Sequence, residues 1–176
     1  MKLVDAENRK EWDDFVTSHP EANFLQSWDF YEFYKSRGNQ IVRRVVWDNN
    51  EIIAAYAGVI ENAKRGRYLA IAGGPILDWG RRELVDAVFA DMRSEGNKHK
   101  CVFVRVRPQL ELSPQSLNLM QELGLRRAPM YLSVEFAGVL GLEKDETEIM
   151  QGMRQRLRRA LRKGAKNDIQ IEKSTN

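Results

Sequence analysis

The sequence has little of what disulfide and soft-metal chemistry requires. Its 176 residues include one cysteine, Cys101, and two histidines, His19 and His99, which excludes an internal disulfide and a multi-thiolate zinc site. No stretch approaches the roughly 18 apolar residues of a membrane span, and acidic residues follow Met1 before the apolar core of a signal peptide could form. We therefore expect a cytoplasmic protein with no metal centre and no transmembrane segment.

Familiar catalytic and nucleotide-binding motifs are also absent. The sequence contains no G-x-S-x-G elbow, no Walker loop and no G-x-G-x-x-G, the patterns that present a serine nucleophile or cradle phosphates. Cys101 opens an apolar strand, where a lone cysteine more often packs as a small hydrophobic residue than reacts as a thiolate. Covalent catalysis is therefore disfavoured, and no catalytic residue is assigned.

What the sequence does contain suffices for one folded domain. Hydrophobic residues make up 43% of the chain and charged residues 30%, as in ordinary globular proteins. Periodicity predicts helices over 6–18, 28–37, 79–95, 114–123 and from 145 onward, and strands over 41–47, 51–60, 67–72, 101–106, 130–136 and, as an optional closing strand, 168–171. The expected helix caps are Asp5, Ser27, Asp78 and Ser113. This order predicts an α/β domain with a mixed, largely antiparallel sheet flanked by helices.

Positive charge is concentrated near the end of the chain. Seven basic residues and no acidic residue lie between positions 154 and 166: Arg154, Arg156, Arg158, Arg159, Arg162, Lys163 and Lys166. Removing their seven charges from the formal net charge of +3 leaves the rest of the chain at −4. Clustered cations attract anionic partners such as phosphate or nucleic acid.

The same segment predicts an amphipathic helix that begins near Asp145. At about 100° per residue, the apolar residues fall within an arc of about 120°, and the basic residues cover most of the remaining circumference. The apolar residues are Ile149, Met150, Met153, Leu157, Ala160 and Leu161. Two interpretations stay open here: a surface that binds polyanions, or a solvated helix face.

Three other features have both a functional and a structural interpretation. Lys35 follows Phe33 and Tyr34 in the last turn of a helix, where a lysine can bind a diphosphate or simply stabilise the helix dipole. Gly73-Gly74-Pro75 at a strand end permits close approach of a ligand or forms a turn. Arg105, in the strand over 101–106, points either to a phosphate or to solvent.

Several segments in order resemble the FemA/FemB/FemX-type peptidoglycan-bridge aminoacyltransferases. They are Asn23-Phe24-Leu25-Gln26-Ser27-Trp28, Arg67-Tyr68-Leu69 with Gly74-Pro75-Ile76-Leu77-Asp78, Phe103-Val104-Arg105-Val106-Arg107-Pro108, and residues 150–164. The resemblance covers nearly the whole chain, which matches the first half of such proteins. It implies a GNAT-like domain and transfer of an amino acid from aminoacyl-tRNA to the stem peptide of a UDP-linked or lipid-linked muropeptide. No metal or acetyl-CoA takes part, so no cofactor is expected.

The resemblance also implies where the substrates bind. Lys35 matches a lysine that binds the diphosphate of the precursor, and Ala72 to Pro75 match a turn beside the precursor site. The expected substrate-binding residues are Trp28, Lys35, Tyr68, Gly73, Gly74, Pro75 and Arg105. The basic helix matches the one that ends the first domain of the family, so its seven cations are the expected tRNA-binding or anion-binding residues. Such substrates place the protein in the cytoplasm or at the inner face of the membrane.

The chain departs from the family pattern at several positions. Gly73 stands where the family often has arginine, Arg107 where it often has aspartate, and Ala160 where it often has asparagine. We expect a GNAT-like domain over 1–141, then a basic helix and tail over 142–176 that lead toward a second GNAT-like domain or chain. A truncated protein, one subunit of a split enzyme and a stand-alone relative all fit this organisation. The alternative function is a noncatalytic RNA-binding or anion-binding module that uses the basic helix.

Overall fold

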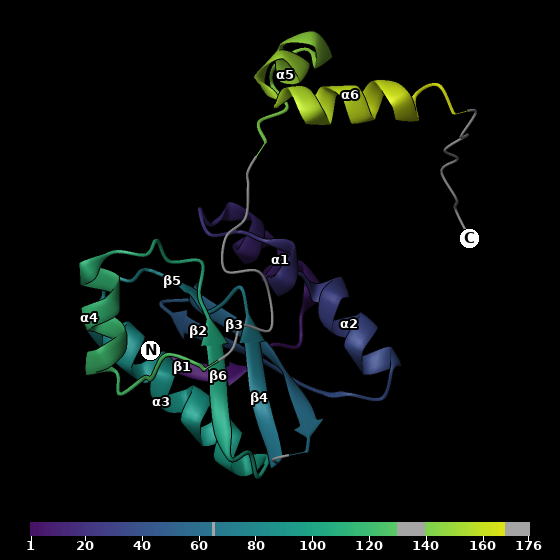
Figure 1. The fold of residues 1–176 in the computed structure, drawn as a ribbon. Helices are drawn as coiled ribbons and strands as arrows, with labels where there is room; N and C mark the ends of the chain where they lie inside the picture. The colour runs from purple at the N-terminus through teal and green to yellow at the C-terminus, as the bar shows by residue number, and fades with distance from the viewer. Residues whose placement is uncertain (65, 130–139, 168–176) are drawn as a thin grey trace. The chain divides into compact units, whose positions relative to one another are not determined.

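The computed structural model describes residues 1–64, 66–129 and 140–167, and contacts divide the chain into two units, Met1–Pro129 and Met130–Asn176 (Figure 1). The first unit contains β1 (Lys2–Asp5), α1 (Arg9–Ser18), the 3-10 turn η1 (Phe24–Gln26), α2 (Trp28–Ser36), β2 (Gln40–Asp48), β3 (Glu51–Ala63), β4 (Gly66–Ala72), β5 (Ile76–Leu77), α3 (Arg82–Lys98), β6 (Phe103–Arg107) and α4 (Pro114–Glu122). The second unit contains α5 (Glu146–Gly152) and α6 (Gln155–Gly164). The strands expected over 130–136 and 168–171 lie outside the described residues, and the domain boundary expected at 141/142 stays a prediction.

The described strands form one mixed sheet in the order β1-β2-β3-β4-β6, with β5 paired to β3. All pairs are antiparallel except β4 and β6, which run parallel. The hairpin between β2 and β3 turns at Asn49 and Asn50, whose φ angles are 48° and 65°, as the type I′ turn requires. The predicted α/β fold with a mixed, largely antiparallel sheet is confirmed.

Two hydrophobic cores lie on the two faces of the sheet. On one face α3 contributes Leu84, Val88 and Met92, which belong to the same buried cluster as Leu69 and Ile71 of β4. On the other face α1 and α2 contribute Trp12, Val16 and Tyr31, buried with Val45 and Val59. Alternation along each strand assigns its residues to the two cores in turn.

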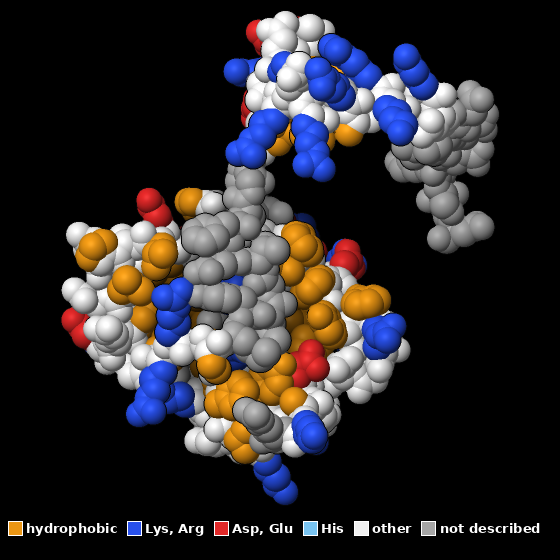
Figure 2. All heavy atoms as spheres, in the orientation of Figure 1, with side chains coloured by type: hydrophobic (Ala, Val, Ile, Leu, Met, Phe, Trp, Pro, Cys, Tyr) orange, Lys and Arg blue, Asp and Glu red, His pale blue; other side chains and the backbone are white. Residues whose placement is uncertain are grey.

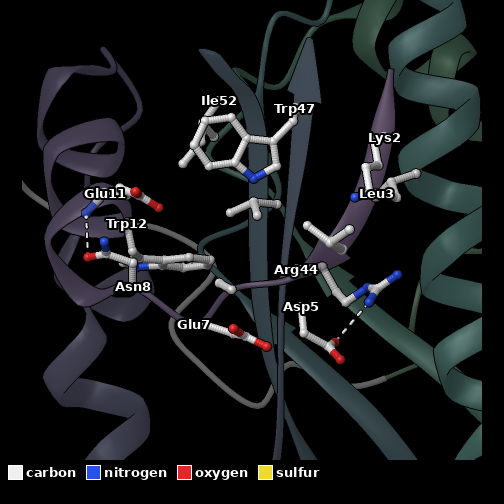
Figure 3. A pocket seen from close by; sticks show the side chains of 13 residues that line it. Lys2, Leu3, Asp5, Glu7, Asn8, Glu11, Trp12, Arg44, Trp47 and Ile52 are labelled. Atoms are coloured by element: carbon white, nitrogen blue, oxygen red, sulfur yellow. Dashed lines mark hydrogen bonds and ion pairs between the residues drawn. The ribbon is translucent and has the colours of Figure 1, made fainter. Parts of the chain in front are cut away.

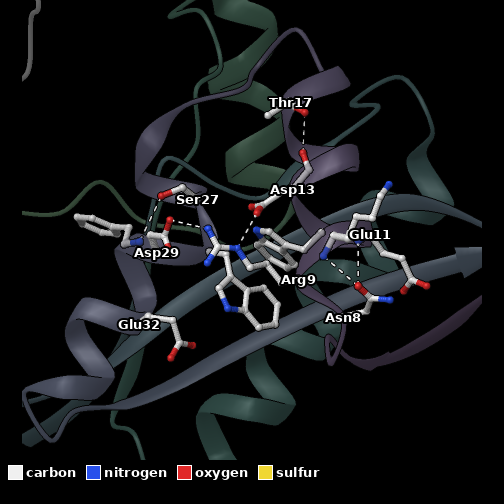
Figure 4. Close-up of polar contacts among 12 residues, drawn as sticks. Asn8, Arg9, Glu11, Asp13, Thr17, Ser27, Asp29 and Glu32 are labelled. Carbon is white, nitrogen blue, oxygen red and sulfur yellow. Dashed lines mark hydrogen bonds and ion pairs between the residues drawn. The ribbon is translucent and has the colours of Figure 1, made fainter.

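The helices α1 and α2 are also joined at the surface. The Arg9 guanidinium of α1 donates to Asp13 at 3.2 Å and to Asp29 of α2 at 2.7 Å (Figure 4). Ser27 caps α2 as expected, because its hydroxyl oxygen accepts a hydrogen bond from the Phe30 N–H. Since the Arg9 ion pairs are exposed, their contribution to stability is small.

Two predicted helix caps are wrong. Asp5 ends β1 and pairs with Arg44, and Asn8 instead caps α1 by accepting hydrogen bonds from the N–H groups of Lys10 and Glu11. Asp78 accepts a hydrogen bond from Gly80 N–H, and α3 begins only at Arg82. In both cases the local sequence favours a cap, but the aspartate has a different partner.

Two details of the predicted helices also differ. Phe33, which precedes Lys35 in α2, is 55% exposed, and the buried ring of this helix is Tyr31. The single helix expected from Asp145 is two helices that break between α5 and α6 at Met153 and Arg154. The guanidinium of Arg158 donates to the carbonyl oxygens of Gln151 and Met153 at 3.0 and 2.6 Å, so an α6 arginine satisfies the end of α5. No helix in the described ranges is long and apolar enough to cross a membrane.

The feature that positions the rest of the first unit is a gap in the sheet beside β3. β4 pairs with β3 from Ala63 to Val59, and β5 pairs with it again at Ala55 and Ala54. The buried side chain of Gln26 fills the interval between these two pairings. Its Nε2 donates to the carbonyl oxygens of Ala57 and Ala72 at 3.1 and 2.7 Å, and its Oε1 accepts from Ala57 N–H at 2.8 Å. One side-chain amide thus replaces the missing strand pairing.

Removing this amide should destabilise the protein strongly. In Gln26→Met the side chain keeps a similar volume, but Ala57 N–H and Ala72 C=O lose their partner. Each buried unsatisfied group costs about 1–3 kcal/mol, so we expect a loss of about 3 kcal/mol or more in the free energy of unfolding. Urea denaturation measures it. Gln115→Met, at an exposed position of α4, is the control and should change stability by less than about 0.5 kcal/mol. A similar small loss for both variants would contradict this role of Gln26.

Candidate functional site

The face of β4 and β6 that α3 does not cover carries two of the seven predicted substrate-binding residues, Tyr68 and Arg105. Val104 and Val106 pack into the core under α3, so the alternate residues of β6 point to the opposite face. The register places Tyr68 beside Phe103, Ala70 beside Arg105, and Ala72 beside Arg107. Figure 2 shows hydrophobic side chains over one end of β4 and β6 and along α2.

An aromatic pair lies at one end of this face. The rings of Tyr68 and Phe103 stack with their centroids 4.8 Å apart, and Phe103 is 48% exposed. Partial burial raises the pKa of Tyr68, the Glu61 carboxylate raises it further, and the Arg105 guanidinium opposes both. The pair therefore combines a flat apolar surface with charged side chains from β3 and β6, a combination that suits a ring-containing polar ligand.

The two predicted residues of α2 differ in their surroundings. Trp28 is partly buried: the Arg43 guanidinium lies 3.8 Å from its ring centroid, and the Trp12 ring meets it edge to face at 6.4 Å. Trp28 therefore helps to fasten α2 to β2 and α1. Lys35 lies exposed in the last turn of α2, where its ammonium group can reach a soluble anion.

The Gly73-Gly74-Pro75 turn packs against the chain itself. All three residues are buried. A Cβ at Gly73 would lie 2.2 Å from the Oδ1 of Asn23, and a Cβ at Gly74 would lie 2.8 Å from the Cδ of Gln26. Both glycines thus allow the loop before α2 to approach the sheet closely. This packing explains the glycines without a ligand, and their predicted contact with substrate stays a prediction.

Sequence reasoning missed the side chains that hold this turn. The Nδ2 of Asn23 donates to the Gly73 carbonyl at 2.9 Å, and Gly73 N–H donates to the Arg107 carbonyl at 2.9 Å. Nearby, the indole N–H of Trp79 donates to the Glu21 carboxylate at 2.8 Å. Burial raises the pKa of Glu21, and the Trp79 hydrogen bond only partly offsets it. No local motif marks these residues, because each partner is distant in the sequence.

A cavity of about 630 Å³ lies at the opposite edge of the sheet, between β1, β2 and the start of α1 (Figure 3). Trp12, Trp47 and Ile52 form apolar walls, and Glu7 and Glu11 add carboxylates. None of the predicted substrate-binding residues lines it. In the described ranges, no cluster of three or more His, Cys, Asp or Glu side chains could hold a metal ion.

The basic segment belongs to the second unit and is described by itself. Leu157 and Leu161 share one face of α6 and are 49% and 43% exposed. The predicted anion-binding residues are exposed, with the exception of the partly buried Arg158: Arg154, Arg156, Arg159, Arg162, Lys163 and Lys166. The amphipathic character predicted for this segment is therefore kept within α6, and its role in binding stays a prediction.

Comparisons with known proteins give a consistent family and fold. The FemAB family model matches residues 8–176. Aminoacyltransferase FemA of Staphylococcus aureus (strain bovine RF122 / ET3-1) is 26% identical, with 92% of this chain and 44% of FemA covered. The crystal structure of FemX has a TM-score of 0.77 at 20% identity, covering 99% of this chain and 46% of FemX. The chain thus spans a little under half the length of these relatives.

Single-domain acetyltransferases share the fold. Glucosamine-6-phosphate N-acetyltransferase from Arabidopsis thaliana has a TM-score of 0.55 at 15% identity, covering 77% of this chain and 98% of that enzyme. The predicted GNAT-like fold is therefore confirmed.

Two of the glycines with positive φ, Gly73 and Gly38, give a test of the turn. Their φ angles are +69° and +84°, but a Cβ meets the Asn23 side chain at Gly73 and nothing within 4 Å at Gly38. Alanine at either position strains the backbone by about 1–2 kcal/mol. We expect Gly73→Ala to cost about 2 kcal/mol more than Gly38→Ala, because it also overpacks the turn. Urea denaturation of both variants measures the difference, and equal losses would show that the packing at Gly73 relaxes freely.

Proposed function

The chain belongs to the FemAB family, and from this premise we propose that it is an aminoacyltransferase of peptidoglycan synthesis, or the first GNAT-like domain of one. The observation that carries the proposal is the family match over residues 8–176. Its relative FemA is named an aminoacyltransferase. In this proposal the donor is an aminoacyl-tRNA, and the acceptor is an amine on the stem peptide of a UDP-linked or lipid-linked muropeptide. Such substrates place the protein in the cytoplasm, at the inner face of the membrane for a lipid-linked acceptor.

The face of β4 and β6 supplies a surface for the acceptor in this proposal. Lys35 binds the diphosphate of the precursor, since an exposed ammonium group is suited to a phosphate partner. The stacked rings of Tyr68 and Phe103 offer an apolar platform for a sugar or a base. Arg105, on the same face, contributes positive charge toward the precursor.

The proposed reaction needs positioning more than a reactive side chain. The ester of an aminoacyl-tRNA is already activated, and an amine attacks its carbonyl carbon once the two are held in the right orientation. The amine loses a proton, and the ribose oxygen leaves and takes up a proton. The thiol of Cys101 fits no nucleophilic role, because burial raises its pKa.

A transfer assay tests the proposal. The chain is incubated with charged tRNA and a UDP-linked or lipid-linked muropeptide, and mass spectrometry detects the added amino acid. Transfer that is lost in Lys35→Ala supports the proposed enzyme. Absence of transfer both from the chain alone and from the chain supplied with the second half of a FemAB relative would count against it.

Binding of the muropeptide gives a sharper test of Lys35. A charge-assisted contact contributes about 1.5–3 kcal/mol, so Lys35→Ala should weaken binding of a UDP-muropeptide roughly tenfold to 100-fold. Isothermal titration calorimetry measures the change. Lys64→Ala, at another exposed lysine, is the matched control and should leave the affinity unchanged. Equal effects of the two substitutions would remove Lys35 from the proposed site.

The second candidate function is a noncatalytic RNA-binding module. The observation in its favour is the cationic segment over 154–166, which contains no acidic residue. In this alternative α6 binds phosphates by releasing counterions, and the chain transfers nothing. In the first candidate the same helix draws in the tRNA, so RNA binding is common to both and only the transfer assay separates them.

The contribution of α6 is testable by salt dependence. For three to six phosphate contacts, log K for single-stranded RNA should fall with log salt at a slope of about −2 to −4. Replacing Arg156 and Arg159 with glutamine should reduce the magnitude of the slope by about 1.4. Fluorescence anisotropy with a labelled oligoribonucleotide measures both. Lys2→Gln with Lys64→Gln, two exposed cations of the first unit, is the control, and an identical slope for both double variants would exclude α6 as the binding surface.

A further inference from the structure

The outer edge of the sheet at β1 is unpaired. β1 comes first in the strand order, and β2 is its only neighbour in the described sheet. Ala6 N–H, just after the strand, donates to the Arg43 carbonyl of β2. Backbone groups alternate in direction along a strand, so those of Leu3 and Asp5 point away from β2. They have no hydrogen-bond partner in the part of the chain that the structure describes.

The cavity of about 630 Å³ runs along this strand, because every residue from Lys2 to Asn8 lines it. Val4 and Ala6 pack with the core under α1 and α2, whereas Leu3 packs with the core under α3. Leu3 thus lines the cavity although its side chain points to the opposite face of the sheet, and we infer that its backbone faces the open space. The unpaired edge of β1 therefore borders the cavity.

The cavity combines apolar surface with negative charge. Trp47 and Ile52 line it and are half-buried, and Figure 3 shows them between α1 and β1. Glu7 and Glu11 line it from the start of α1 and the residues before that helix. Both glutamates are exposed, and within the described ranges neither carboxylate has a hydrogen bond or an ion pair.

The basic residues of the cavity leave these two carboxylates unbalanced. The Arg44 guanidinium donates to the carboxylates of Asp5 and Asp91 and is neutralised by them. Lys2 is exposed and lies at the other end of β1 from Glu7. A complementary partner therefore presents a basic side chain to the two glutamates, and such opposite charges favour the right partner over others.

We propose that the edge of β1 binds an extended segment of another protein by strand addition. An added strand that pairs with Leu3 and Asp5 sends alternate side chains to the face that carries Val4, which is the face of the cavity. One such side chain is apolar and packs against Trp47, and another is basic and lies beside the two glutamates. The inference is independent of the aminoacyl transfer proposed above.

The first experiment uses a basic peptide of defined sequence. An acetylated and amidated peptide, Thr-Lys-Thr-Val-Thr-Lys-Thr, is titrated into the full chain, and the indole N–H signal of Trp47 is followed by NMR. Trp47→Phe identifies this signal among the four tryptophans. We expect a saturable shift of the Trp47 signal. The same peptide with glutamate in place of both lysines should produce none.

A second experiment separates strand addition from attraction between charges alone. Alternate N–H groups of an added strand face its neighbour, and the others face solvent. Two further peptides carry one N-methyl group each, on the central valine or on the threonine before it. One of the two should bind about tenfold or more weakly than the parent peptide, because it loses a main-chain hydrogen bond and places a methyl group at the edge. Equal affinities of the two methylated peptides would contradict strand addition.

Substitution of the two glutamates tests the charge of the partner. Glu7→Gln combined with Glu11→Gln should weaken binding of the basic peptide about fivefold, because two exposed ion pairs are lost. Glu83→Gln is the matched control, since Glu83 is exposed in the first turn of α3 as Glu11 is in the first turn of α1. The control should leave the affinity unchanged.

Three results would overturn the inference. One is an unchanged Trp47 signal at saturating concentrations of the basic peptide. Another is equal affinity for the basic and the acidic peptide, which would give the glutamates no part in recognition. The third is a dimer, detected by analytical ultracentrifugation, that the basic peptide does not dissociate. That result would assign the edge of β1 to a second copy of this chain.

Discussion

The first unit depends on the buried amide of Gln26. Its side chain bridges β3 and β4 where the strands part, and its backbone carbonyl accepts the indole N–H of Trp12 at 2.8 Å. The hydroxyl of Tyr31 receives a further bond from the amide at 3.0 Å. One residue thus joins α1, α2 and two strands. A buried network of this kind specifies a single arrangement only if every member is satisfied.

The two faces of the sheet differ in what they carry where β4 separates from β3. Toward α3 the strands keep a continuous apolar core, with Leu69 and Ile71 fully buried. Beyond its carboxyl end the chain leaves β4 through the glycine turn, and on the other face of the sheet β6 carries Arg105 and Arg107 beside Ala70 and Ala72.

The sequence predicts the elements better than it predicts the site. Strand alternation and helical periodicity are local signals, and within the described residues the structure confirms most of the elements that they predict. The helix cap predicted at Asp5 is wrong because the partner of Asp5, Arg44, lies 39 residues away in the sequence. The contacts of the loop over 21–26 could not be predicted for the same reason. Glu21, Asn23 and Gln26 bond to groups that lie 58, 50 and 46 residues away in the sequence. Only the family resemblance points to this loop, through the Leu25-Gln26-Ser27-Trp28 block, and it says nothing of why Gln26 is needed.

The arginines of the two units also have different uses. In the first unit Arg44 donates to both oxygens of Asp91 at 2.8 and 2.9 Å, and Tyr56 donates to the same carboxylate at 2.7 Å. Arg82 pairs with Asp86 and Glu122 in a similar way. These cations are neutralised by the fold and cannot attract a polyanion. Over 154–166 no carboxylate accompanies the cations, and only Arg158 has a structural bond, to the end of α5. The positive charge of this segment is therefore not balanced by carboxylates within it.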